Sequence, residues 1–584
     1  MTCPWVRKVL LAAAVATVLV LGTSAAHADG DLNHVHHIII MMQENHSYDN
    51  YFGVLGYVPA SPYHNAKGRR GCAASDHTCV DGLSCKTPPH GGVLTCHNSN
   101  PSNLGGRVHA FHEPRYCTGP DLDHSWIGSH EEGNLKRPNG MLRASPNNGF
   151  VKVNAQTEGG PQVTDHDTMG YYDDTDLPFY YDLAKTFAIS DRYFCAVIGQ
   201  TFPNRAYFLA GTSFGHLTTN EIITPGGYQP STGTIFDHLD AAGVSWIDYF
   251  SDLPYSLMFR TSTGHTKPVA SFAADAAAGR LPAVAFVDPS ALVDQPINGS
   301  QYETDEHPPA DVRAGEYFVA QVVTALRNSP SWKDSILFVT YDEHGGYYDH
   351  VKPPPASQGR VRGHRVPTPD GIAPGQCADA SNPPASEQPG GGVTCSHSQT
   401  VDAPGLCPAF TPTGRYPGDC PTFNQLGFRV PLLAISPFSK PHYVSHVVNS
   451  HTSFLALIEK RFSLPSLTAR DANANDLEDL FDFDSSPSLD ASVGTAPLPQ
   501  QPPASHVAIR AARSDARLGA RPRLERRLAG AGRSVSAAGR GMRRSGTHSS
   551  RPPASAPASA RRERAVRFTH APRPCRRRVS RSPD

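Results

Sequence analysis

Continuous apolar runs recur along the middle of the chain, and amphipathic stretches separate several of them. Runs rich in Val, Ile and Leu that do not alternate with polar residues are typical of strands buried on both faces. Helical periodicity precedes two of these runs, in TIFDHLDAAG (234–243) and RAGEYFVAQVVTALRNSP (313–330). The pattern therefore predicts an α/β fold in which helices flank a central, mostly parallel sheet. The five predicted strands are VHHIIIMM (35–42), VSWIDYF (244–250), AVAFVD (283–288), SILFVTYD (335–342) and VPLLAIS (430–436).

The first 28 residues have the pattern of a secretory signal peptide. A short basic start precedes an apolar core, and small residues stand at Ala26 and Ala28. Such a segment is removed on export, so we expect a secreted or cell-envelope (periplasmic) protein without a transmembrane span in the mature chain. A membrane anchor is the disfavoured alternative, because the apolar core is short and wrongly flanked.

The twelve cysteines support export. Most of them lie in two Gly- and Pro-rich insertions, near residues 60–120 and 355–425. Loop-rich segments bury few apolar side chains, and in an oxidising compartment disulfides would stabilise them. The cysteine spacings match no zinc-site pattern well, which favours disulfides over metal binding.

The net charge of −1 conceals an uneven distribution. Residues 501–584 are rich in Arg, Ala, Ser and Pro and lack apolar periodicity, which predicts a disordered tail after a catalytic domain at 29–500. One interpretation is an extension without function. The other is an arm that contacts an anionic membrane or nucleic acid through charge. No motif for recognition of a specific nucleic acid accompanies it.

Polar residues follow two of the predicted strands. Glu44 and Asn45 come directly after the first run, and Asp342 and Glu343 come directly after the fourth. The carboxyl ends of parallel strands meet at one edge of a sheet, so three carboxylates and an amide should converge there. Their repulsion calls for a cation. Hard oxygen ligands suit Ca²⁺, Mg²⁺ or Mn²⁺, and nearby histidines keep Zn²⁺ or Fe open. The alternative is a solvated, polar strand end.

Thr201 lies in GQTFPNR, where a turn leads into a predicted helix. A hydroxyl at this junction faces backbone N–H groups and the positive end of the helix dipole, which favour a phosphate. Coordination to a metal would lower the pKa of the hydroxyl and make it a nucleophile. The simpler interpretation is a helix cap.

Four stretches resemble a known family. They are QENHSYDNYFG (43–53), GQTFPNRAYFLAGTS (199–213), YDEHGGYYDHV (341–351) and FRVPLLAISPFSK (428–440). They are similar to the bacterial phosphoesterase family that includes the non-haemolytic phospholipases C and a related acid phosphatase, and the similarity extends over residues 34–462. The resemblance implies an alkaline-phosphatase-like α/β fold. It also implies phosphate-ester hydrolysis by a metal-assisted hydroxyl nucleophile.

Individual roles follow from this resemblance. Thr201 matches the position of the Ser or Thr nucleophile, which also binds the metal, while His124, Glu306 and His307 resemble residues that line the phosphate site. Where many members have Arg after the Glu-Asn pair, this chain has His46, which changes the local charge. The metal ligands implied by the resemblance are Glu44, Asn45, Asp342 and Glu343.

Three functions are compatible with these residues. The first is an exported phospholipase C that cleaves the glycerol-side phosphodiester of a phospholipid. The second is an acid phosphatase that acts on phosphomonoesters with the same site. The third is a secreted binding protein in which the metal is structural. An intact hydroxyl beside intact ligands disfavours the third, because a binding module needs no nucleophile.

Overall fold

The computed structural model describes residues 32–490 with internal gaps. The segments outside the described residues are 68–70, 88–93, 119–120, 135–146, 158–165, 214–218, 220–232, 293–294, 298–299, 357–359, 362–363, 366–422 and 424, together with both ends of the chain. The predicted signal peptide (1–28), the Arg-rich tail (501–584) and most of the second insertion (355–425) therefore lie outside the described residues. Among the residues that are described, no helix combines the length and the apolar character needed to cross a membrane.

An eight-stranded sheet forms the centre of the molecule, and it contains all five predicted strands. Strand β20 runs antiparallel to both of its neighbours, β17 and β10, and the remaining neighbours in the sheet pair in parallel. The mostly parallel α/β fold is confirmed. In spatial order the strands are β13 (Thr266–Pro268), β12 (Trp246–Phe250), β14 (Val284–Asp288), β1 (His37–Gln43), β17 (Ser335–Tyr341), β20 (Leu432–Ile435), β10 (Ala188–Ser190) and β21 (Val444–Ser445).

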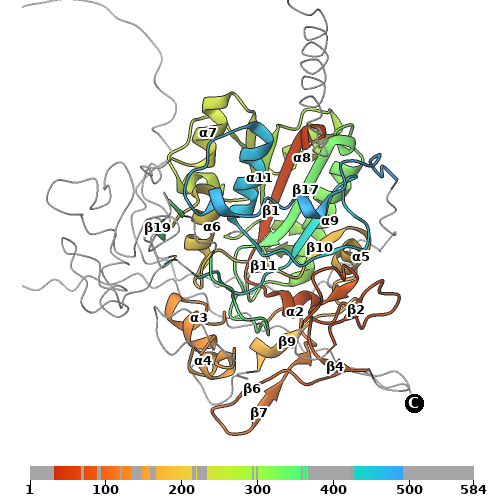
Figure 1. The fold of residues 1–584 in the computed structure, drawn as a ribbon, viewed down its shortest axis with the longest axis vertical. Helices are drawn as coiled ribbons and strands as arrows, with labels where there is room; N and C mark the ends of the chain where they lie inside the picture. The colour runs from red at the N-terminus through yellow and green to blue at the C-terminus, as the bar shows by residue number, and fades with distance from the viewer. Residues whose placement is uncertain are drawn as a thin grey trace, which may run out of the picture. The chain divides into compact units, whose positions relative to one another are not determined.

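Helices cover the sheet on both sides, with α6, α7 and α11 on one side and α5 and α9 on the other (Figure 1). The two predicted helices form as α7 and α9. Thr234 caps α7 in a reciprocal capping box with Asp237, and Asp311 caps α9. The longer helices are α5 (Pro178–Thr186), α6 (Thr201–Ala210), α7 (Ile235–Ala242), α8 (Ala270–Ala277), α9 (Val312–Arg327) and α11 (Thr452–Phe462).

The central strands are apolar on both faces because both faces are covered. All seven residues of β17 and all five of β14 are buried. Their side chains join one large core with α9, whose apolar positions repeat at helical spacing. The sequence pattern therefore predicted the layers correctly, and the core fixes the edge of the sheet at which β1 and β17 end.

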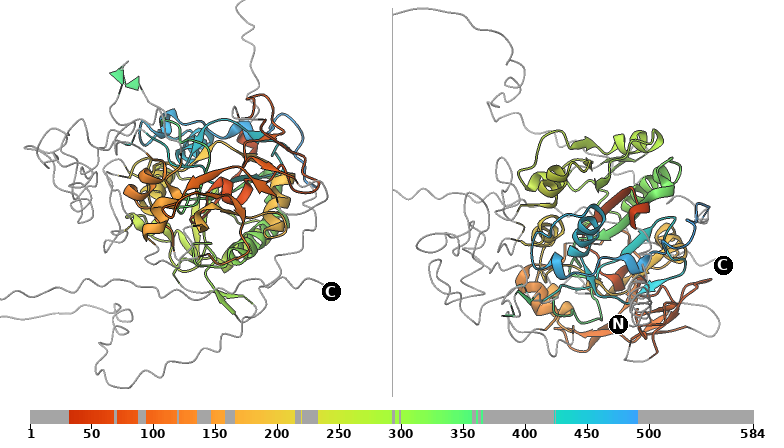
Figure 2. Two further views of the ribbon diagram at one scale, coloured as in Figure 1. Left: turned by 90° about the horizontal axis from the view of Figure 1, so that it is seen from below. Right: turned by 45° about the horizontal axis from the view of Figure 1, so that its top comes forward.

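Short elements surround the end of the sheet to which β1 leads. The first Cys-rich segment lies there beside α2 and is seen across the front in the left view of Figure 2. Two disulfides confirm the prediction for this segment, Cys72–Cys79 and Cys85–Cys96. The helices near this end of the sheet are α2 (Tyr48–Phe52), α3 (Trp126–Glu132) and α4 (Phe150–Thr157). The strand pairs of this region are β2 (His64–Asn65) with β3 (Cys79–Val80), β4 (Cys85–Lys86) with β5 (Thr95–Cys96), β6 (Ser99–Pro101) with β7 (Arg107–His109), and β8 (Phe111–His112) with β9 (Gly170–Tyr171).

Other loops also contain short two-stranded sheets. They are β11 (Tyr193–Phe194) with β22 (Asn449–Ser450), β15 (Gln295–Ile297) with β16 (Ser300–Tyr302), and β18 (Arg360–Val361) with β19 (His364–Arg365). The 3₁₀ turns are Leu32–His34, Asp167–Met169, Tyr255–Met258 (η4), Trp332–Asp334, Asp471–Asn473 (η7) and Glu478–Leu480. Of these turns, η4 matters most for function, because it brings Tyr255 to the candidate site.

Candidate active site

The carboxyl ends of β1 and β17 bring four predicted ligands together. The two strands are parallel neighbours and stay paired to their last residues, so Glu44 and Asn45 emerge beside Asp342 and Glu343. All four are buried. The backbone N–H of Asn45 donates to Oδ1 of Asp342 across 3.3 Å, which links the two strand ends directly.

The loop after β17 packs closely against Asn45. Asn45 has φ 64°, and Gly345 has φ +60°. A Cβ at position 345 would lie 2.1 Å from the carbonyl oxygen of Asn45. Only glycine fits both the left-handed conformation and this close approach. The conformations of the two loops are therefore coupled.

Burial raises the pKa of two carboxylic acids in this group. Burial raises the pKa of Asp342 to about 7, and the nearby negative charge of Glu44 adds to the effect. Burial likewise raises the pKa of Glu343 to about 7, although the positive charge of His124 opposes the change. Such carboxylates hold their charge at neutral pH more readily when a cation lies between them.

Polar atoms of Asn45 and Glu343 fit a metal ion. Both side-chain polar atoms of Asn45, and Oε1 of Glu343, are buried without a hydrogen-bond partner among the residues described. Buried polar groups are rarely left unpaired, because each costs about 1–3 kcal/mol. The unpaired amide oxygen of Asn45 and the unpaired Oε1 of Glu343 are hard-oxygen atoms of the kind that a divalent cation binds.

Arg205 and Tyr255 complete this group, although the sequence pattern did not single them out. Arg205 places Nη2 3.0 Å from Oε1 of Glu44 and Nε 3.4 Å from Oδ2 of Asp342. Its guanidinium also lies 3.7 Å from the ring centroid of Tyr255, whose hydroxyl donates to Glu44. One signal was present in the sequence, since Arg205 stands four residues after Thr201 and so shares its helix face.

Thr201 is the first residue of α6 and is buried. Because Arg205 lies one helical turn further on and contacts Glu44 and Asp342, the start of α6 lies beside the acidic group. Gln200 precedes the helix and makes no side-chain capping bond. The first turn of α6 therefore lies near the edge where the strands end, and its Phe202 N–H donates to the hydroxyl of Thr219.

His124 and His307 lie near Glu343 and each other. Nε2 of His124 is 3.7 Å from Oε1 of Glu343, and the centroids of the two rings are 6.2 Å apart. Burial lowers the pKa of His124, but the charges of Glu343 and Asp121 outweigh it and raise that pKa to about 9. The same balance, with Asp121 the largest favourable charge, raises the pKa of His307 to about 10. Asp121 was not predicted, and with the two histidines it forms a group that could also hold a cation.

Glu306, which the family resemblance places at the phosphate site, lies among tyrosine side chains. Its buried carboxylate accepts hydrogen bonds from three tyrosine hydroxyls and from the side-chain amide of Gln43. Burial raises its pKa to about 7, although these hydrogen bonds lower it. The described donors to this carboxylate are all protein groups. Glu306 therefore links the side chains that pack beneath the strand ends. The three tyrosines are Tyr51, Tyr180 and Tyr341.

Two further histidines support the loops. His46 lies between the Asn50 side chain and the carbonyl of Glu306, and burial lowers its pKa to about 4, so it carries no charge at neutral pH. His344 lies 2.7 Å from a carboxylate oxygen of Glu132 and 3.2 Å from Oε2 of Glu343. His344 therefore lies between the carboxylates of Glu132 and Glu343.

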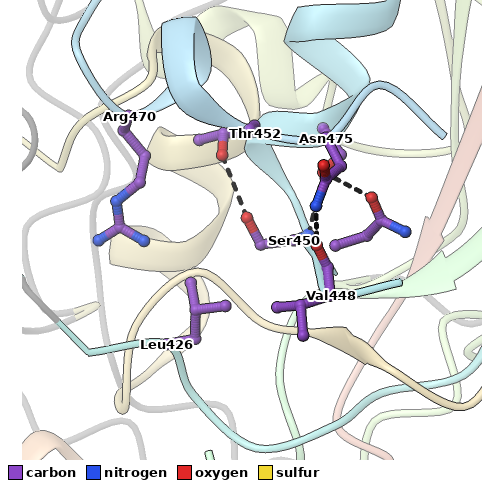
Figure 3. A pocket seen from close by; sticks show the side chains of 9 residues that line it. Leu426, Val448, Ser450, Thr452, Arg470 and Asn475 are labelled. Atoms are coloured by element: carbon purple, nitrogen blue, oxygen red, sulfur yellow. Dashed lines mark hydrogen bonds between the residues drawn. The ribbon is translucent and has the colours of Figure 1, made fainter. Parts of the chain in front are cut away.

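A small pocket at the start of α11 is lined by residues other than those of the candidate site. Figure 3 shows that Ser450, Thr452, Arg470 and Asn475 are among the residues that line it. The hydroxyls of Ser450 and Thr452 bond to each other at 3.1 Å, and Arg470 donates to two backbone carbonyls. None of the predicted site residues lines this pocket.

Comparison with known proteins identifies the family. The model of the Phosphoesterase family matches residues 35–465. The chain belongs to the Phosphoesterase family. As a member of the Phosphoesterase family with phospholipases C among its relatives, it is a phosphoric ester hydrolase. The sequence-based resemblance is thereby confirmed.

Proteins similar to this chain come from a bacterium and a plant. The chain is 32% identical over 511 residues to phospholipase C B of Mycobacterium tuberculosis, a match that covers 79% of this chain and 80% of that protein. It is 28% identical over 476 residues to non-specific phospholipase C6 of Arabidopsis thaliana, covering 78% of this chain and 73% of that protein.

Solved structures show only distant likeness. Murine ectonucleotide pyrophosphatase/phosphodiesterase 5 is 12% identical, with 52% of this chain and 95% of that chain covered at a TM-score of 0.29. A phosphonate monoester hydrolase from Silicibacter pomeroyi is 10% identical, with 53% and 72% covered at a TM-score of 0.27. At these scores the likeness does not bear on the assignment, which rests on the family match.

Proposed function

We propose that this phosphoesterase is an exported, metal-dependent phospholipase C that hydrolyses the glycerol-side phosphodiester of a phospholipid. The observation that carries the proposal is the convergence of buried ligand atoms from β1 and β17 beside the first turn of α6. The printed names of its relatives support a phospholipid as substrate. The products would be diacylglycerol and a phosphorylated head group.

The ligand set of the proposed metal site comes from three elements. Glu44 and Asn45 follow β1, Asp342 and Glu343 follow β17, and Thr201 begins α6. A divalent ion held there, whether Ca²⁺, Mg²⁺, Mn²⁺, Zn²⁺ or Fe²⁺, would lower the pKa of a hydroxyl and neutralise phosphate charge. Arg205 offsets part of the negative charge of these carboxylates, and a divalent ion would offset more of it.

The protein groups divide the remaining chemistry among them. Oγ1 of Thr201, once it has lost its proton, attacks phosphorus, and the bond to the glycerol oxygen breaks. The phosphorylated head group is then joined to Thr201 as a phosphodiester, and water hydrolyses that bond to release the phosphorylated head group. His124 or His307 protonates the departing glycerol oxygen, or the pair holds the phosphate oxygens as charge shifts. Glu306 supports this site through the tyrosines that it binds.

An acid phosphatase is the alternative function. The same nucleophile and metal site would release phosphate from a monoester, and the family resemblance in the sequence includes such an enzyme. The names of the relatives favour the lipid substrate. A secreted binding protein fits less well, because the family match identifies a hydrolase.

The ends of the chain complete the proposal. Residues 1–28 would direct export, and the Arg-rich tail at 501–584 would contact anionic membranes through charge without recognition of a specific nucleic acid. A chain truncated after Gln500 should keep its turnover of a soluble substrate. It should bind anionic vesicles less well at low salt, where such attraction is strongest.

A product assay tests the proposed function. Purified protein is incubated with phosphatidylcholine and, in parallel, with a soluble phosphomonoester. Release of diacylglycerol and phosphocholine is the expected result. Release of inorganic phosphate from the monoester, without diacylglycerol from the lipid, would contradict the phospholipase assignment and favour the phosphatase.

A further inference from the structure

Large apolar side chains are exposed near the edge of the sheet that carries the candidate site. They belong to Leu257, Leu292 and Ile127, whose exposed fractions are 48%, 64% and 47%. Leu257 comes after β12 in the chain, and Leu292 comes after β14. Because β12, β14, β1 and β17 are consecutive parallel neighbours, their carboxyl ends share one edge. The loops that carry the two leucines therefore begin at the edge where Glu44 and Asp342 emerge.

The turn η4 holds Leu257 at the surface. The other residues of this turn, Tyr255, Ser256 and Met258, are buried. Tyr255 is anchored twice, since its N–H donates to Asp288 at 2.7 Å and its hydroxyl donates to a buried carboxylate of the candidate site. The neighbours of Leu257 thus occupy the protein side of the turn. Its side chain cannot turn inward unless these contacts break.

The loop that carries Leu292 is tied to the segment between β12 and η4. Oδ2 of Asp252, in that segment, accepts the N–H groups of Leu292 and Ala291 at 2.6 and 3.0 Å. The same oxygen accepts the hydroxyl of Ser290 at 3.0 Å. Hydrogen bonds therefore fix the backbone at Leu292, and its side chain still extends into solvent.

Ile127 lies on the opposite flank of the candidate site. It stands in the first turn of α3, where Ser125 caps the helix and Trp126 is buried. His124, just before this helix, places Nε2 3.7 Å from Oε1 of Glu343 in the loop after β17. In the sheet, β17 and β14 are on opposite sides of β1. The exposed apolar side chains thus come from both sides of the candidate site.

We propose that Leu257, Leu292 and Ile127 are the residues by which the protein docks on the surface of a phospholipid bilayer, with the candidate site facing the head groups. In a bilayer the phosphodiester lies at the interface, directly above the acyl chains. Apolar side chains that enter the acyl region leave water and so strengthen the attachment. Exposed apolar side chains near a catalytic group are typical of such contacts. The inference rests on the proposed function, because only a lipid substrate requires the site to meet a bilayer.

Replacement of these side chains by serine should weaken the binding of vesicles. Loss of one leucine from an apolar contact changes an equilibrium constant by about tenfold or more, so Leu292→Ser should weaken binding by about tenfold. The triple variant Ile127→Ser/Leu257→Ser/Leu292→Ser should bind at least about a hundredfold more weakly, because effects at separate sites add. Turnover of a short-chain phosphatidylcholine that is dissolved as single molecules should not change, since it needs no bilayer contact.

The experiment measures sedimentation of the full-length protein with phosphatidylcholine vesicles on ice. High salt screens attraction through charge, so the binding that remains reports apolar contact. Leu489→Ser is the matched control, because Leu489 is as exposed as Leu257, at 48%. Its carbonyl oxygen accepts from Trp332, in the turn that leads into β17 and so near the opposite edge of the sheet. Wild type and Leu489→Ser should bind vesicles equally, and circular dichroism checks the fold of each variant.

The contrary results are distinguishable. Equal vesicle binding by wild type and the triple variant would overturn the inference, while release of diacylglycerol from the short-chain lipid would leave the proposed function standing. A triple variant that keeps its vesicle binding but no longer forms a dimer present in wild type would assign the surface to a second copy of the chain and also overturn the inference. Failure of the wild type to release diacylglycerol from either lipid would refute the proposed function, and this inference with it.

Discussion

The charge of a buried carboxylate depends on the groups that surround it. In the candidate site, Arg205 and the histidines balance part of the negative charge of Asp342 and Glu343. Glu459 in α11 instead lies next to another acid, Asp471 of η7. Burial raises the pKa of Glu459 to about 9, an effect to which the charge of Asp471 adds.

The raised pKa of Glu459 predicts a pH-dependent contribution to stability. The folded protein keeps this proton up to about pH 9, whereas the unfolded chain loses it at about pH 4.3. The folded state therefore binds more protons between these values, and the free energy of unfolding falls as pH rises through this window. Glu459→Gln keeps a neutral side chain at every pH. From about pH 6 to pH 8, its free energy of unfolding should therefore fall by about 1–3 kcal/mol less than that of wild type.

Denaturant unfolding at the two pH values measures this difference. The exposed Glu131 provides a matched control, and Glu131→Gln should follow the wild-type pH dependence. Identical pH profiles for wild type and Glu459→Gln would show that Glu459 is ionised in the folded protein.

Among the secondary-structure elements, β1 and β17 and the loops that follow them determine the site. Their parallel pairing places the ligands side by side, and the turn at Gly345 holds the second loop against Asn45. The site is thus a property of two adjacent loops rather than of either one. A defect in one loop should disturb ligands from both strands.

Gly345→Ala tests this coupling. The new Cβ would lie 2.1 Å from the Asn45 carbonyl oxygen, so the loops must separate. We expect weaker metal binding and a loss of unfolding free energy of about 1–3 kcal/mol. Gly243 has φ +67°, and no atom lies within 4 Å of the position that a Cβ would occupy there, so Gly243→Ala adds backbone strain without a clash. Measured by dialysis and unfolding, equal metal affinity in the two variants would contradict the coupling.

Over the whole molecule, the sequence predicted the layers better than the details of the site. The buried strands could be predicted because apolar β-runs leave a local pattern, and the polar residues that follow β1 and β17 could be placed at one edge of the sheet for the same reason. The contact between Tyr255 and Glu44 joins residues 211 positions apart, and no local pattern marks it. Glu306 was placed by similarity of its neighbours, yet the folded chain surrounds its carboxylate with tyrosines from distant elements.

The metal should also stabilise the whole domain. A ligand that binds only the folded state adds stability, by about 2.7 kcal/mol at a hundredfold excess over its dissociation constant. Chelation should therefore lower the melting temperature and abolish activity together, and addition of Mn²⁺ should restore both. Scanning calorimetry with parallel assays checks this. A stripped protein with full activity and an unchanged melting temperature would contradict the metal site.

The most direct test of the mechanism is a search for phosphate on residue 201 in enzyme quenched with acid during turnover. During turnover of phosphatidylcholine, the account predicts phosphocholine joined to Thr201 in wild type and to the serine in an active Thr201→Ser variant. Thr201→Val keeps the shape without the oxygen, so it should carry no phosphate and lose at least about a thousandfold in turnover. Near-normal turnover of Thr201→Val, with no phosphate on residue 201 in any variant, would contradict the account and show that water attacks phosphorus directly.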